Sequence, residues 1–198
     1  TVKRMESRLP TLAVQKKTVN LIYVKRLTQQ SLFQEPKLVA KFFILLATNF
    51  FTIACVLKNV VALGCGIAVG HGFGDNTIAA MVTRGSAEIS RMGCLLGGQR
   101  ETFSGLSGIG DLVVTCFSSH SRNRVVGESI GKGQSVAEVL AGMKQVAEGV
   151  HTSRAAAEMA REMGIEMPIL ETVSRVLAGE ISVEQGIEGL LIRVPDQE

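Results

Sequence analysis

The sequence predicts an all-α fold for residues 51–198, and three observations support this prediction. Apolar residues in this part recur at intervals of three and four, which is the spacing of one face of a helix. Residue types that start and stop helices stand at the ends of these repeats. Short alternating runs, the pattern of half-buried strands, are weak throughout. We therefore expect a multi-helix domain of roughly six or seven helices.

The first expected helix contains "VLKNVVALGCGIAVG", residues 56–70. Small and apolar residues follow one another here with almost no charge, so the helix should be buried on most of its surface. We expect Gly64, Gly66 and Gly70 to let neighbouring helices approach closely, at a helix-propensity cost of up to about 1 kcal/mol each.

A second helix is expected within residues 73–97. Asp75 or Asn76 is its candidate N-cap, and Gly97 and Gly98 should end it. One face of this helix is apolar. The apolar face consists of Ile78, Met81, Val82, Ile89, Met92 and Leu96.

Further helices follow toward the C-terminus, each with a start or stop signal. Ser135 and Glu138 have the spacing of a capping box. Gly164 should end the next helix, and Pro168 should stand at the start of the one after it. Ser182 is the expected cap of the last helix.

Residues 1–50 differ in composition from the rest of the chain. They carry nine Lys and Arg against two Glu, a charge of +7, whereas residues 51–198 carry 12 against 16, a charge of −4. All 21 glycines lie at Gly64 or later. A glycine-free segment cannot contain the glycine-rich turn that holds a dinucleotide pyrophosphate. We expect a divergent basic segment at 1–50 and a helical substrate-binding and catalytic domain at 51–198.

An uncharged run from Phe42 to Leu57 gives the first segment two interpretations. Its 16 residues fall short of the about 20 that a membrane-spanning helix needs. It also contains Asn49 and ends at Lys58. We expect a buried helix here, and a transmembrane or signal-anchor helix is the alternative.

Lys58 and Asp111 are the two charged residues that stand in apolar surroundings. Burial lowers the pKa of a lysine ammonium and suits it to proton exchange near neutral pH. The alternative is a lysine whose ammonium reaches water at the edge of a helix. Asp111 follows a Gly-Ile-Gly turn, so it is either a helix N-cap or an acid paired with a lysine.

Ser121, Arg122, Asn123 and Arg124 form a run of hydrogen-bond donors ten residues after Asp111. A hydroxyl, an amide and two guanidinium groups suit a phosphate dianion. An exposed loop with no ligand is the alternative for so short a motif.

The motifs taken together resemble one known family. The order "LKNV", "GFGDNT", "GLSGIGDLVVTC", "SRNR" and "QVAEGV" closely resembles the C-terminal helical domain of bacterial-type NAD(P)-dependent glycerol-3-phosphate dehydrogenases. The resemblance runs from about residue 55 to residue 193. It implies the fold of the C-terminal domains of glycerol-3-phosphate and 6-phosphogluconate dehydrogenases.

The resemblance also implies roles for residues around the reacting carbon. Lys58 matches the family's catalytic lysine, which donates and accepts the proton at the secondary oxygen of the substrate. Asp111 matches a catalytic aspartate that contacts this lysine and the substrate hydroxyl. Asn59 and Thr115 match polar residues that line the substrate site.

Other matched positions imply binding of the phosphate and the cofactor. Ser121, Arg122 and Asn123 match the group that holds the substrate phosphate, and Arg122 also reaches the cofactor in the family. Val146 and Glu148 match positions that touch the cofactor from this side. The family's glycine fingerprint for the nucleotide has no counterpart before Lys58 in this chain.

The resemblance implies an oxidoreductase that interconverts sn-glycerol 3-phosphate and dihydroxyacetone phosphate with NAD or NADP. It places the activity in glycerol-3-phosphate and carbohydrate metabolism and in the supply of phospholipid precursors. The cysteines predict a cytoplasmic protein, and a homodimer is the default assembly for a small enzyme. Because the nucleotide domain is missing or replaced, the chain is expected to be incomplete as a single enzyme. The alternative is a non-catalytic helical module that binds a triose phosphate or a full-length subunit.

The composition argues against several other classes of protein. With 46% hydrophobic and 20% charged residues the chain has the composition of a globular protein. A net charge of +3 gives no argument for nucleic acid as a partner. We expect no metal site, because the three histidines lack partners at ligand spacing. The cysteines have neither disulfide-framework nor zinc spacing and are expected to be reduced: Cys55, Cys65, Cys94 and Cys116.

Overall fold

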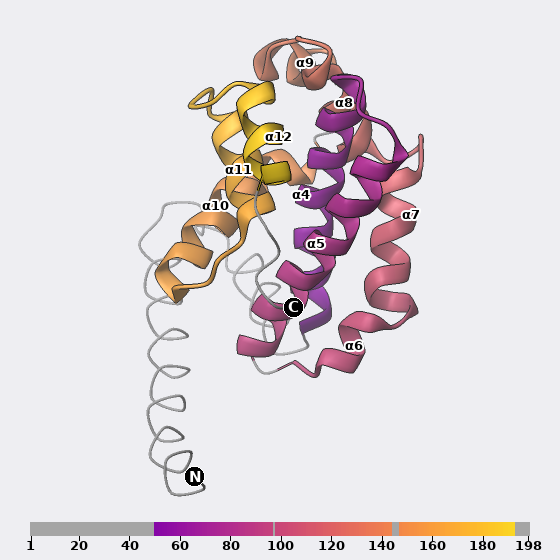
Figure 1. Ribbon diagram of the computed structural model, residues 1–198, viewed down its shortest axis with the longest axis vertical. Helices are drawn as coiled ribbons and strands as arrows, with labels where there is room; N and C mark the ends of the chain where they lie inside the picture. Colours follow the sequence, from indigo (N-terminus) through magenta and orange to yellow (C-terminus); the bar gives the residue numbers. More distant parts are fainter. Residues whose placement is uncertain (1–49, 97, 144–146, 193–198) are drawn as a thin grey trace, which may run out of the picture. The chain divides into compact units, whose positions relative to one another are not determined.

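The computed structural model describes residues 50–96, 98–143 and 147–192. Within these ranges the chain forms helices and no strand, which confirms the predicted all-α fold (Figure 1). The elements are α4 (Phe50–Gly70), α5 (Asp75–Leu95), α6 (Arg100–Ser104), the π-helical turn η2 (Leu106–Gly110), α7 (Asp111–Phe117), α8 (Arg122–Gly131), α9 (Val136–Ala141), α10 (Glu148–Met163), α11 (Pro168–Leu177) and α12 (Val183–Ile192).

The expected six or seven helices were too few for the described part of the chain, which holds nine α-helices. The difference comes from short helices that a repeat of three and four residues does not reveal. Helix α6 has five residues and α7 has seven, with η2 between them. Gly105, in extended backbone conformation, ends α6 and divides this region.

Helix α4 is the centre of the domain. Figure 1 shows it between α7 on one side and α10, α11 and α12 on the other. It packs against α5, α7, α8, α10 and α11. An unbroken stretch from Val60 to Ala68 is buried, as expected for a helix without a charged face. Lys58 therefore lies on a helix that packs against most of the other long helices.

Helices α4 and α8 approach until their backbones touch. A Cβ atom on Gly66 would collide with the carbonyl oxygen of Arg124, and one on Gly127 would collide with that of Leu63. Because neither helix tolerates a side chain at these points, the expected close approach is confirmed. Comparable close contacts occur at Gly64 (against Val173 of α11), Gly70 and Gly131.

Several helix starts and ends were predicted correctly from local sequence signals. Ser135 and Glu138 form the expected capping box of α9. Gly164 ends α10 in the left-handed conformation with φ 65°, and Pro168 is the first residue of α11. The hydroxyl of Ser182 accepts a hydrogen bond from the Gln185 backbone nitrogen at 3.2 Å and so caps α12.

The predicted cap of α5 was wrong. Gly74 is the N-cap, in extended conformation, and Asp75 is already the first helical residue. Neither Asp75 nor Asn76 therefore occupies the position from which a side chain caps the helix. Asp75 still has a favourable place, because a carboxylate in the first turn lies at the positive end of the helix dipole. Helix α5 ends at Leu95, close to the predicted glycines.

The predicted basic segment lies outside the described residues up to position 49, as does the first half of the run from Phe42 to Leu57. The second half of that run, from Phe50 to Leu57, is described and forms the start of α4. Among the helices that are described, none combines the length and the hydropathy needed to cross a bilayer.

Candidate functional site

Lys58 and Asp111 form an ion pair between α4 and α7. The Nζ atom of Lys58 donates a hydrogen bond to Oδ2 of Asp111. The side chains are 20% and 35% exposed, so the pair is partly shielded from water but open on one side. Of the two interpretations of Asp111, the structure has the pairing and not the cap, because Asp111 follows the N-cap residue Gly110 and no side chain caps α7.

The turn before Asp111 is fixed by close backbone packing. Gly108 lies in η2, and a Cβ atom there would collide with the carbonyl oxygen of Phe103. On the other side, Oγ1 of Thr115 donates a hydrogen bond to the Asp111 carbonyl oxygen at 2.6 Å. The predicted substrate-lining Thr115 thus contacts the backbone of Asp111. The first contact fixes η2 against α6, and the second lies within the first turn of α7.

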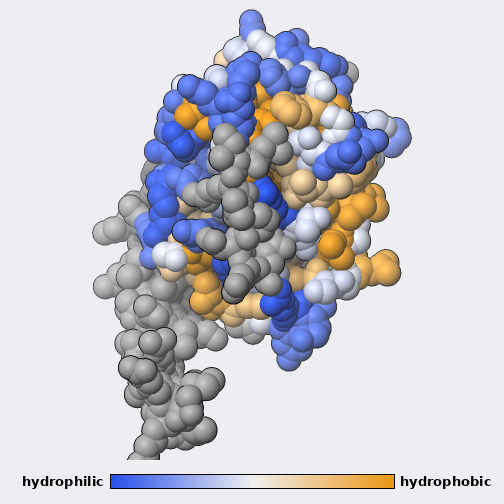
Figure 2. Space-filling model, in the orientation of Figure 1, coloured by the Kyte–Doolittle hydropathy of each residue, from blue (hydrophilic) through white to orange (hydrophobic). Residues whose placement is uncertain are grey.

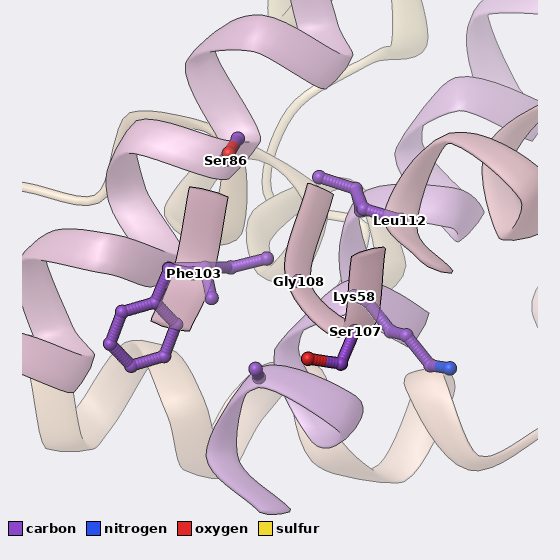
Figure 3. Close-up of a pocket in the computed structure, with 8 residues that line it drawn as sticks. Lys58, Ser86, Phe103, Ser107, Gly108 and Leu112 are labelled. Carbon is purple, nitrogen blue, oxygen red and sulfur yellow. The ribbon is translucent and has the colours of Figure 1, made fainter. Parts of the chain in front are cut away.

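A small pocket lies beside Lys58, between α4, α5, α6 and η2. Figure 3 shows the Lys58 side chain at its edge, with the amine directed away from the Phe103 ring. Apart from Lys58, two residues with hydroxyl groups line this pocket, and the rest of its lining is apolar or glycine. The lining residues are Ala54, Lys58, Ser86, Ile89, Phe103, Ser107, Gly108 and Leu112.

Sequence analysis missed Ser86 and Ser107 of this pocket. Ser107 had a weak signal, because it lies in the glycine-rich "GLSGIG" just before Asp111. Ser86 had no sequence signal, because it belongs to none of the motifs and its distance from Lys58 along the chain does not predict a contact. Helix packing alone brings them to one pocket.

Cys55, one turn before Lys58 on α4, responds to both charges of the ion pair. Burial raises the pKa of the Cys55 thiol, the Lys58 ammonium lowers it, and the Asp111 carboxylate raises it. The thiol is therefore close enough to report on the pair. All four cysteines are free thiols, as expected.

A second group of predicted site residues joins α4, α8 and α10. Nδ2 of Asn59 donates to Oε2 of Glu148 at 3.3 Å. The backbone nitrogen of Gly149 donates to Oδ1 of Asn123 at 2.9 Å. Asn123 is buried while Glu148 is exposed, so the group runs from the core to the surface.

Ser121 and Arg122 stand at the start of α8. Ser121 is its N-cap, and its hydroxyl accepts a hydrogen bond from the Arg124 backbone nitrogen at 3.4 Å. Arg122 is the first helical residue and is exposed. A helix N-terminus with an exposed guanidinium suits an anion. The structure thus has an ion pair between α4 and α7 and an exposed guanidinium at the start of α8, and the backbones of α4 and α8 are in contact.

Comparison with known proteins identifies the family that the sequence motifs resemble. A family model described as the C-terminus of NAD-dependent glycerol-3-phosphate dehydrogenase matches residues 51–188. The chain belongs to this family. The resemblance seen in the motifs is therefore confirmed over most of the helical domain.

Curated relatives of this glycerol-3-phosphate dehydrogenase family match the same part of the chain. The glycerol-3-phosphate dehydrogenase (NAD(P)+) of Pelodictyon phaeoclathratiforme is 54% identical over 146 residues, which are 74% of this chain and 44% of that protein. The enzyme of the same name from Prosthecochloris aestuarii is 53% identical over 146 residues, with the same coverage. The chain therefore spans less than half the length of these relatives.

Solved structures of glycerol-3-phosphate dehydrogenases have the same fold over this region. The crystal structure of the Coxiella burnetii enzyme superposes with a TM-score of 0.70 at 35% identity, covering 73% of this chain and 44% of that one. The Saccharomyces cerevisiae enzyme superposes with a TM-score of 0.66 at 28% identity, covering 73% and 42%.

One predicted cofactor contact of the glycerol-3-phosphate dehydrogenase family, Val146, lies outside the described residues. The roles of the other predicted site residues in catalysis and binding stay predictions. Among the described residues no cluster of three or more His, Cys, Asp and Glu has the arrangement of a metal site.

An apolar surface, made of Leu106, Val113, Val114 and Phe117, lies on η2 and α7 beside the ion pair. Leu106 is 93% exposed, and the other three side chains are also open to solvent. Figure 2 shows hydrophobic residues gathered at the surface over α7. Large apolar groups rarely stand together at a surface unless something packs on them.

Proposed function

We propose that this chain is the substrate-binding and proton-transferring half of a glycerol-3-phosphate dehydrogenase. In this role it serves the interconversion of sn-glycerol 3-phosphate and dihydroxyacetone phosphate. The ion pair between Lys58 and Asp111 is the observation that carries the proposal. It lies in the part of the chain that the family model matches.

NAD(P)H, when bound, supplies the hydride that converts the ketone carbon of dihydroxyacetone phosphate to an alkoxide carbon. The alkoxide oxygen must then gain a proton, and the Lys58 ammonium would supply it. The positive charge also stabilises the developing negative charge before the proton moves. In the reverse direction the neutral Lys58 amine removes the hydroxyl proton. Asp111 holds the ammonium in one place through its hydrogen bond.

The turn at the start of α8 would hold the phosphate. The exposed Arg122 guanidinium supplies charge and two parallel donors, and the first backbone N–H groups of α8 add the positive end of the helix dipole. Fixing the phosphate fixes the carbon to be reduced relative to Lys58, which supplies orientation to the reaction.

The described residues could supply only part of a binding site for the cofactor. Arg122 and Glu148, the two described residues that match cofactor contacts in the family, are exposed. A strand followed by a glycine-rich turn and a helix, the arrangement that holds the pyrophosphate, does not occur among the described residues. We propose that NAD or NADP is held mainly by a nucleotide-binding half outside this region.

Calorimetric titration of the chain with sn-glycerol 3-phosphate and with glycerol tests the proposal. Binding that requires the phosphate supports it, and no binding by a helical, folded sample contradicts it. NADH and NADPH oxidation with dihydroxyacetone phosphate then separates an active chain from a substrate half that needs a partner. Lys58→Met should abolish any turnover, and Lys132→Met is the matched control, because Lys132 is an exposed lysine paired with Glu128.

A second function, a non-catalytic module that pairs with a full-length subunit, is favoured by the apolar surface on η2 and α7. Mixing the chain with a full-length relative and measuring the mass by light scattering tests this proposal. A complex that is lost in Leu106→Glu supports it, and separate elution at micromolar concentration opposes it.

We further propose finer assignments for the protein. They are a cytoplasmic location, a homodimer, and work in glycerol-3-phosphate and carbohydrate metabolism that feeds phospholipid synthesis. The four free thiols support a reducing compartment.

A further inference from the structure

Gly149 stands where α4, α8 and α10 meet. It is buried in the first turn of α10, and its amide hydrogen bonds to Asn123 of α8. The residue before it, Glu148, accepts a hydrogen bond from Asn59 of α4. Two neighbouring residues of α10 thus bind two predicted substrate-site residues on different helices.

No side chain fits at position 149. A Cβ atom there would lie 2.7 Å from the Asn59 carbonyl oxygen and 2.9 Å from Oδ1 of Asn123. Contacts this short repel strongly, so something would have to move. The Asn59 oxygen belongs to the backbone of α4 and cannot rotate away. Only glycine lets the first turn of α10 approach both partners.

The Gly149 amide also decides which way the Asn123 carboxamide faces. A carboxamide has an acceptor end and a donor end, and rotation by half a turn exchanges them. Because a backbone N–H can only donate, it holds the oxygen of Asn123 on its own side at 2.9 Å. The NH2 group is left as the polar end for any other partner. An NH2 group attracts a phosphate, whereas a carboxamide oxygen would repel it.

We propose that Gly149 is a positioning residue for the substrate phosphate, acting through the orientation of Asn123. Its bare backbone brings the start of α10 against α4 and α8, and its N–H turns the donor end of Asn123 outward. The proposal deepens the proposed function and rests on it, since it assumes that a phosphate binds at the start of α8.

Gly149→Ala tests the proposal, with Gly189→Ala as the matched control. Gly189 is an exposed glycine inside α12, and a Cβ atom there would meet nothing within 4 Å. The probes are sn-glycerol 3-phosphate and inorganic phosphate, titrated by calorimetry at a temperature where circular dichroism shows all variants folded. We expect Gly149→Ala to weaken both ligands about tenfold or more, the equivalent of one charge-assisted hydrogen bond. Wild-type affinity in folded Gly149→Ala overturns the proposal.

Asn123→Asp tests whether the NH2 group of Asn123 itself binds the phosphate, apart from the packing of α10 against α8. Asp keeps an acceptor for the Gly149 N–H but has no donor to offer a phosphate. We expect the thermal midpoint to stay close to wild type while phosphate binding is lost. Unchanged phosphate binding in this variant would also overturn the proposal, because the NH2 group would then have no part in holding the anion.

A failure of the proposed function has a different signature. In that case the wild-type chain binds neither probe. The positioning contact is then judged by amide hydrogen exchange of the first turn of α8. If exchange there is faster in Gly149→Ala and not in Gly189→Ala, Gly149 does position the first turn of α8. Equal exchange in both variants overturns that positioning role.

Discussion

The carboxylate of Glu88, on α5, accepts a hydrogen bond from the backbone nitrogen of Ile169, on α11, at 2.8 Å. A second bond comes from the Leu170 nitrogen at 3.3 Å. Pro168, the first residue of α11, has no N–H, so Glu88 satisfies the next two donors of that helix end. Glu88 is only 3% exposed and caps a helix to which it does not belong.

Glu88→Ala should destabilise the domain by about 3 kcal/mol, because two buried N–H groups lose their acceptor. Glu88→Gln keeps one oxygen and should cost less, about 1 kcal/mol. Urea unfolding followed by circular dichroism measures both. Glu158→Ala is the control, since Glu158 pairs with Arg154 at the surface and should change little. Equal stability of Glu88→Ala and Glu158→Ala would contradict the expectation.

Gly66→Ala should destabilise the domain by about 2 kcal/mol, because the new methyl group collides with the Arg124 backbone in α8. Alanine is the better helix former by about 1 kcal/mol, so a gain in stability would show that the helices are not in contact. Gly189→Ala, at an open helix position, should be neutral or stabilising. Denaturant unfolding of the two variants side by side decides between these outcomes.

Alkylation of Cys55 should report the charge of the ion pair. The Lys58 ammonium lowers the pKa of the Cys55 thiol, so Lys58→Met should raise that pKa and slow the reaction with iodoacetamide. The Asp111 carboxylate raises the same pKa, so Asp111→Asn should lower it and speed the reaction. The thiolate is the reacting form, and below the pKa its fraction falls as the pKa rises. Mass spectrometry of the Cys55 peptide gives the rates, and the same rate in both variants would refute the expectation.

Ser121 should have separable effects on stability and binding. Ser121→Ala removes the N-cap of α8 and should cost about 1 kcal/mol of unfolding free energy. Ser121→Asp keeps a good cap but adds a negative charge, so it should leave stability near wild type and weaken sn-glycerol 3-phosphate binding by tenfold or more. Thermal unfolding and calorimetry measure the two effects. Tight phosphate binding by Ser121→Asp would place the anion elsewhere.

Local signals were sufficient to predict much of the fold. The cap at Ser135 depends on Glu138, three residues away, and the ends of α10 and α11 depend on Gly164 and Pro168 themselves. At the start of α5 the capping rule allowed Asp75 or Asn76 as the N-cap. The N-cap is instead the residue before both, Gly74, which has the extended conformation. Local chemistry therefore predicts that a helix starts, and less well at which residue.

Long-range contacts were beyond the same rules. Asp111 lies 53 residues from Lys58. The residues alone left pairing with a lysine as one of two interpretations, and the resemblance to a family indicated that Lys58 is the partner. Glu88 and Gly149 were missed, because their partners lie 81 and 26 residues away in sequence and neither belongs to a local motif. A buried carboxylate and a buried helix glycine acquire meaning only when the facing helix is known.

The backbone contact between α4 and α8 bears on how this domain can change over evolution. Side chains that separate two helices can be enlarged or trimmed in small steps, but the spacing at Gly66 and Gly127 is already the minimum that two backbones permit. No substitution can bring these helices closer, and any larger residue forces them apart in one large step. A variant that accepts a longer or shorter phosphate ester would therefore arise from new side chains on the first turn of α8 and not from a gradual shift of that helix.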